Sequence, residues 1–167
     1  MWNPFRKASL KNGPWESFHD NGQRRERGSH VDGKRDGMWE SWNERGELQA
    51  RGAYVQGKTH GPWVIHRKDG SLLMRGSFDM DQRQGPWTFF WENGQVRQRG
   101  SFNGEERTGL WETFEEDGSL MLKGHYVDGE KDGEWFERGE TIMYPLPVEE
   151  DDPAVDDLTT EVDPATS

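Results

Sequence analysis

Carboxylates and histidines are the side chains of this sequence that could carry out acid–base or metal chemistry. The chain holds 32 aspartates and glutamates and five histidines among its 167 residues. A catalytic carboxylate pair needs two acids facing one site, and a metal centre needs several ligands at short, fixed spacing. The acids instead fall mostly in turn-like segments or at positions expected to face arginine. The histidines share no repeat position and form no H-E-x-x-H motif; they are His19, His30, His60, His66 and His125.

Other catalytic signatures are missing from the sequence as well. It contains no nucleophile elbow, no phosphate-binding loop and no zinc-ligand spacing. Cysteine is absent, which excludes a disulfide framework and a thiolate metal site. The 21 glycines recur at spacings that suit turns and close packing. We therefore predict a protein that is not an enzyme and holds neither a metal nor a cofactor.

The aromatic residues follow a strict period along the chain. Six Gly-x-Trp triplets recur at intervals of 24 residues, beginning with Gly13-Pro14-Trp15, and no insertion breaks the count. A fixed period of this length indicates a repeat architecture in which each unit packs on its neighbours. This argues against a single-core enzyme. The repeat tryptophans, taken below as position zero of each unit, are Trp15, Trp39, Trp63, Trp87, Trp111 and Trp135.

Each unit carries a hairpin signal at positions +6 and +7. Four of five copies read Asn-Gly or Asp-Gly there, and the other is Arg45-Gly46. These dipeptides favour a two-residue type I′ turn. Such a turn pairs residues across the two strands whose position numbers add up to thirteen. Glu at +1 therefore faces Arg or Lys at +12 in three copies. Each tryptophan then faces a glycine, on which its indole is predicted to rest. The glycines are Gly28, Gly52, Gly76, Gly100 and Gly124.

Alternation of side chains along each strand divides the repeat positions between two faces. One face should hold the tryptophans, the mostly aliphatic residues at +9 and the mostly aromatic residues at +15. The other face should hold the Glu–Arg pairs and an aromatic row at +3. This row could bind a partner as an exposed patch, or form a second core if the sheet curls or a bulge shifts the register. Its members are Phe18, Trp42, His66, Phe90 and Phe114.

Short turn signals also separate one unit from the next, as at Asp32-Gly33. In the third link Asp81 stands in place of glycine, and Asn103-Gly104 is shifted by one residue, so we expect other turn types at both. We predict an all-β fold, an elongated antiparallel meander of about six 24-residue hairpins with roughly eleven or twelve strands of about 4–6 residues. Residues 1–12 are interpreted as a cap or edge strand, 13–144 as the repeat array and 145–167 as a disordered acidic tail. Met143-Tyr144-Pro145 could close the last edge of the array.

Charge is concentrated at one end of the chain. The net charge is −11, and residues 145–167 hold eight acids but no lysine or arginine, which leaves 24 acids and 21 bases in the remainder. No basic footprint for nucleic acid is present. No apolar stretch is long enough for a membrane span or signal peptide, so a cytoplasmic protein is expected. The tail could simply solubilise the chain, or dock on a basic partner through acids such as Asp151, Asp152, Asp156 and Asp157.

The spacing of the repeat resembles that of a known family. The pattern G-x-W-x-x-[aromatic]-x-x-x-G-x-[LV]-x-x-x-G-x-[YF] over about residues 10–136 is similar to the variant MORN repeat, which in bacteria characterises a family often labelled YwqK-type antitoxin. MORN repeats of the better-known form carry a G-x-G motif at the hairpin start, where this chain has Gly-x-Trp. The resemblance implies an elongated array of β-hairpins that acts as a binding scaffold, with no catalytic residues.

Two functions from different classes follow from this resemblance. One is a protein-binding module, an antitoxin or immunity factor that inhibits a soluble and basic partner protein. The alternative is a structural or membrane-associated scaffold, although the acidic tail would be repelled by anionic lipid. A mimic of nucleic acid would need a dense carboxylate face, and the near-neutral repeat body argues against it. Open strands at both ends of the array could permit end-to-end assembly.

Overall fold

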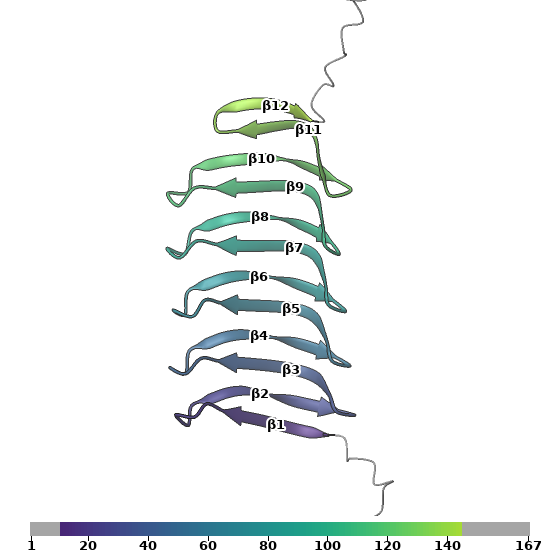
Figure 1. The fold of residues 1–167 in the computed structure, drawn as a ribbon. Coiled ribbons are helices and arrows are strands. Elements are labelled where there is room, and N and C mark those ends of the chain that lie inside the picture. The colour runs from purple at the N-terminus through teal and green to yellow at the C-terminus, as the bar shows by residue number, and fades with distance from the viewer. Residues whose placement is uncertain (1–10, 145–167) are drawn as a thin grey trace, which may run out of the picture.

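The computed structural model describes residues 11–144, and these form one antiparallel sheet. Twelve strands follow one another in chain order from β1 to β12, so every strand pairs only with its neighbours in sequence. Figure 1 shows the strands stacked like rungs from the N-terminal to the C-terminal end. The bounds are β1 Gly13–Phe18, β2 Arg24–Val31, β3 Lys34–Trp42, β4 Leu48–Val55, β5 Lys58–His66, β6 Leu72–Asp79, β7 Gln82–Phe90, β8 Val96–Asn103, β9 Glu106–Phe114, β10 Leu120–Val127, β11 Glu130–Glu137 and β12 Glu140–Tyr144.

The all-β meander predicted from the period is therefore confirmed, and Met143 and Tyr144 do pair on the last edge, as part of β12. The strands are longer than expected, mostly eight or nine residues, because pairing continues from each Gly-x-Trp triplet back to the preceding turn. No helix within residues 11–144 is long and apolar enough to cross a bilayer. The expected cap up to residue 10 and the acidic tail lie outside the described residues.

The turn inside each repeat differs from the one predicted. Trp15 pairs with Gly28 and Glu16 with Arg27, as the sum of thirteen requires, but the register shifts between Ser17 and Phe18. The N–H of Gly22 donates to the His19 carbonyl at 2.9 Å, and φ is positive at Gly22 (84°) but not at the residue before it. This is a three-residue loop, a type I turn followed by a glycine bulge. The prediction of a type I′ turn was wrong.

Side-chain bonding explains why Asn or Asp precedes this glycine. The Asn21 Oδ1 accepts a hydrogen bond from the backbone N–H two residues later at 3.0 Å, and Asn93, Asp69 and Asp117 do the same in their loops. The residue is thus selected as an Asx turn at negative φ. Hydrogen bonds from the Ser71 hydroxyl and backbone N–H lower the pKa of the Asp69 carboxyl below its usual value.

Type I′ turns do occur, but between repeats. Asp32 and Gly33 have φ of 49° and 78°, and the turns at 56–57 and 128–129 follow the same pattern. The turn at 138–139 has the same φ pattern, although it lies within the last hairpin, between β11 and β12. In the turn at Asn103-Gly104, φ is positive at Gly104 alone, so a different turn type is confirmed there, with the pattern of type II′. At the third link the expectation was wrong, because Met80 and Asp81 adopt the type I′ conformation without glycine, at φ of 48° and 77°.

Replacing Met80 with asparagine should stabilise the protein. Met80 is partly exposed and holds a left-handed conformation that asparagine adopts at lower cost. We expect the free energy of unfolding to rise by about 0.5–1 kcal/mol. Urea denaturation of Met80→Asn measures this, and the same exchange at Met38, which lies in extended β3, serves as the control. Equal effects at the two positions would contradict the prediction.

Successive hairpin loops are also connected along one edge of the sheet. The His19 Nε2 lies 2.8 Å from the Trp42 carbonyl, and the Trp91 Nε1 donates to the Phe114 carbonyl at 3.1 Å. Both side chains stand at position +4, and each reaches the last residue of the strand that precedes the loop of the following hairpin. These bonds satisfy backbone groups that the bulged ladder leaves outside regular pairing.

The two faces of the sheet have distinct compositions. We call one side of the sheet the tryptophan face; it carries the residues at positions zero, +2, +11 and +15. We call the other side the ion-pair face; it carries the residues at +1, +3 and +12, together with the middle residue, x, of each Gly-x-Trp triplet. The mostly aliphatic residues at +9 belong to the ion-pair face, since Leu48 pairs with Trp42 across the bulge. Their predicted place beside the tryptophans was wrong, because the loop bulge inverts the alternation between +9 and +11.

Candidate interaction surfaces

One aromatic ring from each strand joins a continuous row on the tryptophan face. The four inner repeat tryptophans each meet the ring at +15 of their own hairpin and of the preceding one, mostly edge to face, as for Phe102 and Trp111 at 4.9 Å between centroids. Trp15 meets the +15 ring of its own hairpin, His30, and Trp135 meets Tyr126 and Tyr144. Such contacts stabilise aromatic pairs beyond their buried area. In chain order the row, called here the aromatic ladder, is Trp15, His30, Trp39, Tyr54, Trp63, Phe78, Trp87, Phe102, Trp111, Tyr126, Trp135 and Tyr144.

The glycine under each indole is not the one predicted. A Cβ built on Gly28 would lie 2.3 Å from the indole of Trp39 in the following repeat, and no atom of Trp15 is among its three nearest contacts. Backbone pairing of Trp15 with Gly28 is as expected, yet the indole resting on Gly28 comes from the opposite neighbour. The register between β2 and β3 shifts at Gly28, and this bulge lets the Trp39 indole lie across β2. Its Nε1 donates to the Ser29 carbonyl at 3.1 Å.

The same indole geometry recurs through the array. Trp63, Trp87, Trp111 and Trp135 each donate to the carbonyl ten residues earlier at 3.1 Å. These four and Trp39 are at most 7% exposed. The repeat tryptophans are therefore structural, as the period suggested, and five of the six are too buried to offer a binding surface.

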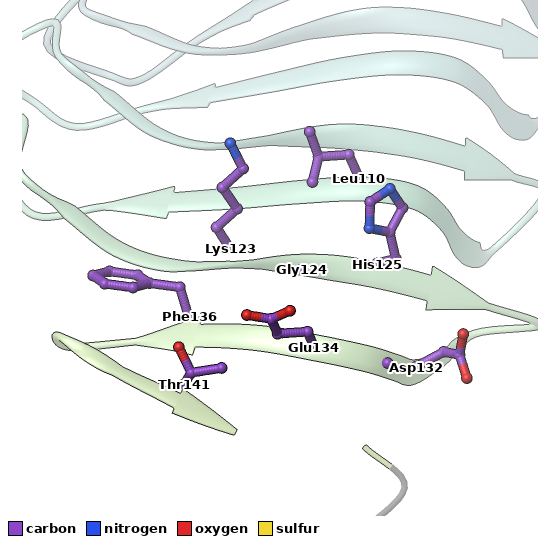
Figure 2. A pocket seen from close by; sticks show the side chains of 9 residues that line it. Leu110, Lys123, Gly124, His125, Asp132, Glu134, Phe136 and Thr141 are labelled. Carbon is purple, nitrogen blue, oxygen red and sulfur yellow. The ribbon is translucent and has the colours of Figure 1, made fainter. Parts of the chain in front are cut away.

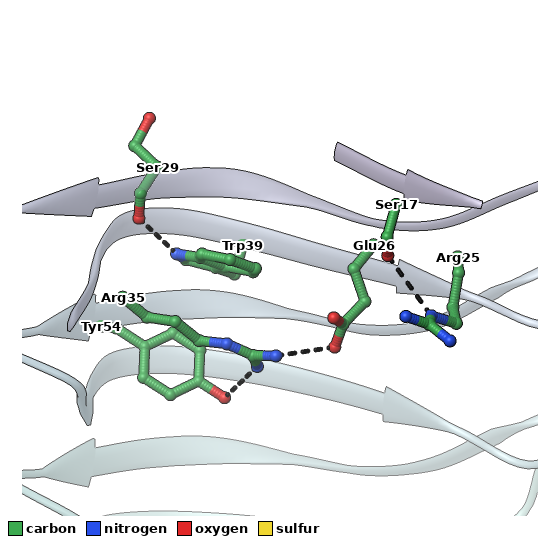
Figure 3. A network of polar contacts seen from close by, with 7 residues as sticks. All are labelled: Ser17, Arg25, Glu26, Ser29, Arg35, Trp39 and Tyr54. Carbon is green, nitrogen blue, oxygen red and sulfur yellow. Dashed lines mark hydrogen bonds and ion pairs between the residues drawn. The ribbon is translucent and has the colours of Figure 1, made fainter. Parts of the chain in front are cut away.

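A row of cationic side chains covers the aromatic ladder. Each of these cations stands four residues before a repeat tryptophan in the sequence. Arg35 lies 4.3 Å from the centre of the Trp39 ring, and its guanidinium donates to Glu26 at 2.8 Å and to the Tyr54 hydroxyl at 3.3 Å, as Figure 3 shows. Burial alone would lower the pKa of Arg35, but the bonds to Tyr54 and Glu26 outweigh it and raise the pKa. The row comprises Lys11, Arg35, Arg83, Arg107 and Lys131, with Thr59 at the third position.

His30 is the one titratable member of the ladder that changes charge near neutral pH. It lies between Trp15 and Trp39, and its Nδ1 is buried without a hydrogen-bond partner among residues 11–144. Burial lowers the pKa of His30, the charges of Lys11 and Arg35 lower it further, and Glu26 opposes them. The neutral imidazole therefore belongs to the folded state.

Acidification should loosen the first hairpin. Because the folded pKa lies below the unfolded value of about 6.5, the unfolded state binds the proton first, and stability is lost as pH falls below that value. We expect the β1–β2 amides to exchange faster at pH 5 than at pH 7, after correction for intrinsic rates, and His30→Phe to remove the difference. The β7–β8 hairpin, with Phe102 at the same position, provides an internal control. Unchanged protection of β1–β2 in the native chain would contradict this.

Two glutamates on the ion-pair face, Glu40 and Glu112, each bridge two cations. Glu40 binds Arg27 of the preceding hairpin and Arg51 of its own, the latter at 3.6 Å. Glu112 binds Arg99 at 2.6 Å and Lys123 at 3.3 Å. Burial raises the pKa of the Glu112 carboxyl, but the bonds from Arg99 and Lys123 prevail and lower it. The Glu–Arg register predicted within hairpins is confirmed, and the structure adds the pairing between hairpins.

The aromatic row at +3 lies on the ion-pair face, as predicted, but cations of the preceding hairpin cover part of it. Arg27 lies over Trp42 at 5.8 Å, and Arg99 over Phe114 at 5.3 Å. Phe90 is 8% exposed, whereas Phe18 of the first hairpin is 54% exposed. His66 is half-buried. The sheet brings these five residues into one row without making them a uniformly open ridge, and their role in partner binding stays a prediction.

A second row on the ion-pair face is more exposed and was not singled out from the sequence. It consists of the x residues of the first five Gly-x-Trp triplets, with Met38 53% and Leu110 41% exposed, and Pro14, Pro62 and Pro86 also exposed. The x residue of the sixth triplet is Glu134. Val31, Val55 and Val127 lie exposed on the same face. The alternation rule places x opposite to tryptophan and could have found this row. We call it the apolar row: Pro14, Met38, Pro62, Pro86 and Leu110.

The C-terminal part of this face is hollowed. A depression of about 530 Å³ is lined by Gly124 and by the side chains around it. Figure 2 shows four of these side chains, Leu110, Lys123, Glu134 and Phe136. The depression is open and shallow because the sheet is a single layer. Within residues 11–144 no group of three or more His, Asp or Glu side chains is placed to hold a metal ion. The predicted tail acids Asp151, Asp152, Asp156 and Asp157 lie outside the described residues.

Comparison with known proteins finds one family to which three stretches of the chain are similar. Residues 11–32, 83–103 and 107–128 match the family described as MORN repeat variant. No curated protein is similar enough to count as a relative. Among the matching solved structures is a crystal structure of the GtfA/B complex bound to UDP and GlcNAc, 15% identical, with 59% of this chain and 19% of that chain covered and a TM-score of 0.26, too low to carry an argument. MORN repeats form protein-interaction modules and are generally not catalytic. Three repeats of this chain thus match the MORN repeat variant.

Proposed function

We propose that this protein is an antitoxin- or immunity-type inhibitor that binds a soluble, basic protein through the ion-pair face. The observation that carries the proposal is the apolar row, which exposes Met38, Leu110 and three prolines beside regularly spaced charges. Exposed apolar side chains rimmed by polar ones are typical of protein-binding surfaces. The tryptophan face offers less to a partner, because its rings are covered by arginine and lysine.

The size of the face also suits a protein partner. Twelve strands about 4.8 Å apart make a sheet about 53 Å long, and nine-residue strands make it about 30 Å wide. That area of about 1,600 Å² exceeds the roughly 800 Å² that each partner contributes to a stable interface. A shallow single layer is, by contrast, poorly suited to enclosing a small molecule.

The charge of the chain favours a basic partner. The net charge is −11, and most of the excess lies in residues 145–167, beyond the folded array. Charge of this kind raises the rate of encounter with a basic protein and disfavours acidic ones. In this proposal the tail steers the partner, and the apolar row supplies the contact that holds it.

The test begins with capture of partners from the native host. The full chain, the chain truncated after Tyr144, and the variant Met38→Glu/Leu110→Glu are compared as baits. Met80→Glu is the matched control, because Met80 is exposed to a similar degree but lies in a turn between strands. We expect one basic protein to be retained by the full chain and by Met80→Glu, and lost by at least tenfold with the double variant. Circular dichroism checks that each variant is folded.

The inhibitory role is tested by expressing the captured protein alone and together with this chain. Growth arrest by the partner, relieved by the native chain but not by Met38→Glu/Leu110→Glu, is the expected result. A partner that does not inhibit growth, or a chain that sediments with anionic vesicles and captures no protein, would overturn the proposal and favour a scaffold role.

A further inference from the structure

The ion-pair face changes composition in the middle of the array. Position +1 is glutamate in β1, β3 and β9, but Val64 in β5 and Thr88 in β7. The paired position +12 stays arginine throughout this stretch. The result is a run of three arginines, Arg51, Arg75 and Arg99, with no acid at the paired positions between them. We call these three residues the central arginine row.

Arg75 is the residue of this row whose charge is least compensated. Arg51 and Arg99 each bind one glutamate, Glu40 and Glu112, at the outer ends of the row. Arg75 is exposed and lies 5.5 Å from the centre of the Phe90 ring, and within residues 11–144 it forms no ion pair with a carboxylate. Contact with an aromatic ring does not neutralise the guanidinium, so the charge of Arg75 remains available to an added anion.

Apolar side chains flank the row on the side of the Gly-x-Trp triplets. Pro62 and Pro86 are exposed, and Leu110 is 41% exposed. A segment that fits this surface would therefore carry several carboxylates interspersed with small or aliphatic residues.

The chain itself contains such a segment. From Val148 to Leu158 it reads V-E-E-D-D-P-A-V-D-D-L, with six acids, five apolar or proline residues at its ends and centre, and no base. It follows directly after β12, so its distance from the array is set by a short connection.

We propose that residues 149–157 bind the central arginine row of the same chain and cover the ion-pair face until a partner displaces them. The distances permit this. From Tyr144 in β12, Arg99 in β8 is about 22 Å away and Arg75 in β6 about 30 Å, counting strand steps of about 4.8 Å and an offset of about 10 Å along the strands. An extended chain spans about 24 Å to Asp151 and about 44 Å to Asp157.

Tethering makes an otherwise weak set of contacts effective. Single exposed ion pairs contribute little, and salt weakens them further. A short connection raises the effective concentration of the segment at the face to the millimolar range. A basic partner would compete for the same acids, so its arrival would release the segment and expose the apolar row. The proposal itself does not depend on that partner or on the inhibitory role.

The direct test uses a labelled synthetic peptide of residues 145–167 as the probe. It should bind the chain truncated after Tyr144, and bind the full chain about tenfold more weakly, because the attached segment competes. Arg75→Glu/Arg99→Glu in the truncated chain should reduce binding at least tenfold, and Arg45→Glu, in an exposed loop, should not. A peptide with its acids changed to Asn and Gln should not bind.

Amide spectra of the full and truncated chains provide a second, independent measurement. Differences should centre on β5 to β8, disappear in about 0.5 M salt, and be unaffected by protein concentration. Identical spectra, equal peptide binding by both chains, or differences confined to β11 and β12 would overturn the proposal. Differences that grow with protein concentration would also overturn it, in favour of contact between two copies. Circular dichroism shows whether the arginine variants remain folded, and Arg75→Gln replaces them if they do not.

Discussion

Replacing Gly100 with alanine should destabilise the array by about 3 kcal/mol or more. A Cβ at this position would lie 2.2 Å from the indole of Trp111, too close for any real contact. The indole cannot move away easily, because it packs against Phe102 and Tyr126 and donates to the Ser101 carbonyl. Overpacking therefore either displaces the ring and breaks its hydrogen bond or separates β8 from β9. Urea denaturation followed by tryptophan fluorescence measures the loss.

Gly94→Ala is the matched control for this experiment. Gly94 has φ of 84° and no atom near the added Cβ, so alanine there meets only the backbone cost of a left-handed conformation, about 1–2 kcal/mol. Gly100 has no such positive φ, and its cost comes from the clash alone. If Gly100→Ala proved no more damaging than Gly94→Ala, the close packing of indole on glycine would be disproved.

Trp111→Ala should have one of the largest effects of any single truncation in the array. The side chain is 1% exposed and joins the rings of two hairpins, so its loss leaves a cavity and an unpaired carbonyl at Ser101. Truncation of a buried tryptophan costs about 3–5 kcal/mol. Because each repeat contacts only its neighbours, the break should uncouple β1–β8 from β9–β12. Hydrogen exchange should then show two blocks that open separately.

The same substitution at Trp15 tests whether burial causes the effect. Trp15 occupies the same repeat position, but it is only half-buried, and no strand within residues 11–144 lies beyond β1. We expect a loss of about 1–2 kcal/mol, confined to the first hairpin. Similar losses at both positions, or continued single-step unfolding of Trp111→Ala, would show that the ladder does not couple the repeats.

Much of the fold could be predicted because each unit repeats the same local instructions. The 24-residue period, the turn residues and the cross-strand Glu–Arg positions agree on one register, and pairs such as Trp39 with Gly52 and Glu40 with Arg51 follow it. The turn types were predicted less well. Asn-Gly suits both a type I′ turn and an Asx-stabilised type I loop, and the choice depends on a backbone N–H two residues later.

The binding face was predicted only in outline. Alternation correctly placed the aromatic row on the ion-pair face, but not the arginines that cover Trp42 and Phe114, which come from the preceding hairpin. The exposure of Met38 and Leu110 likewise depends on the sheet being a single layer with nothing packed over that face within the described residues. Both properties arise from contacts between units, which the pattern of one unit does not contain.

The sequence by itself determined the repeat length, the strand order and the hairpin register, since these follow from local turn preferences and from a side-chain period of two. The tertiary structure alone decided which glycine supports each indole. Gly28 pairs with Trp15, yet it is covered by Trp39, because a bulge opposite Gly28, where Gly37 has φ of 75°, turns the indole across the preceding strand. The direction in which a side chain leans depends on the twist and bulging of both neighbouring strands, and these exist only once the sheet is assembled.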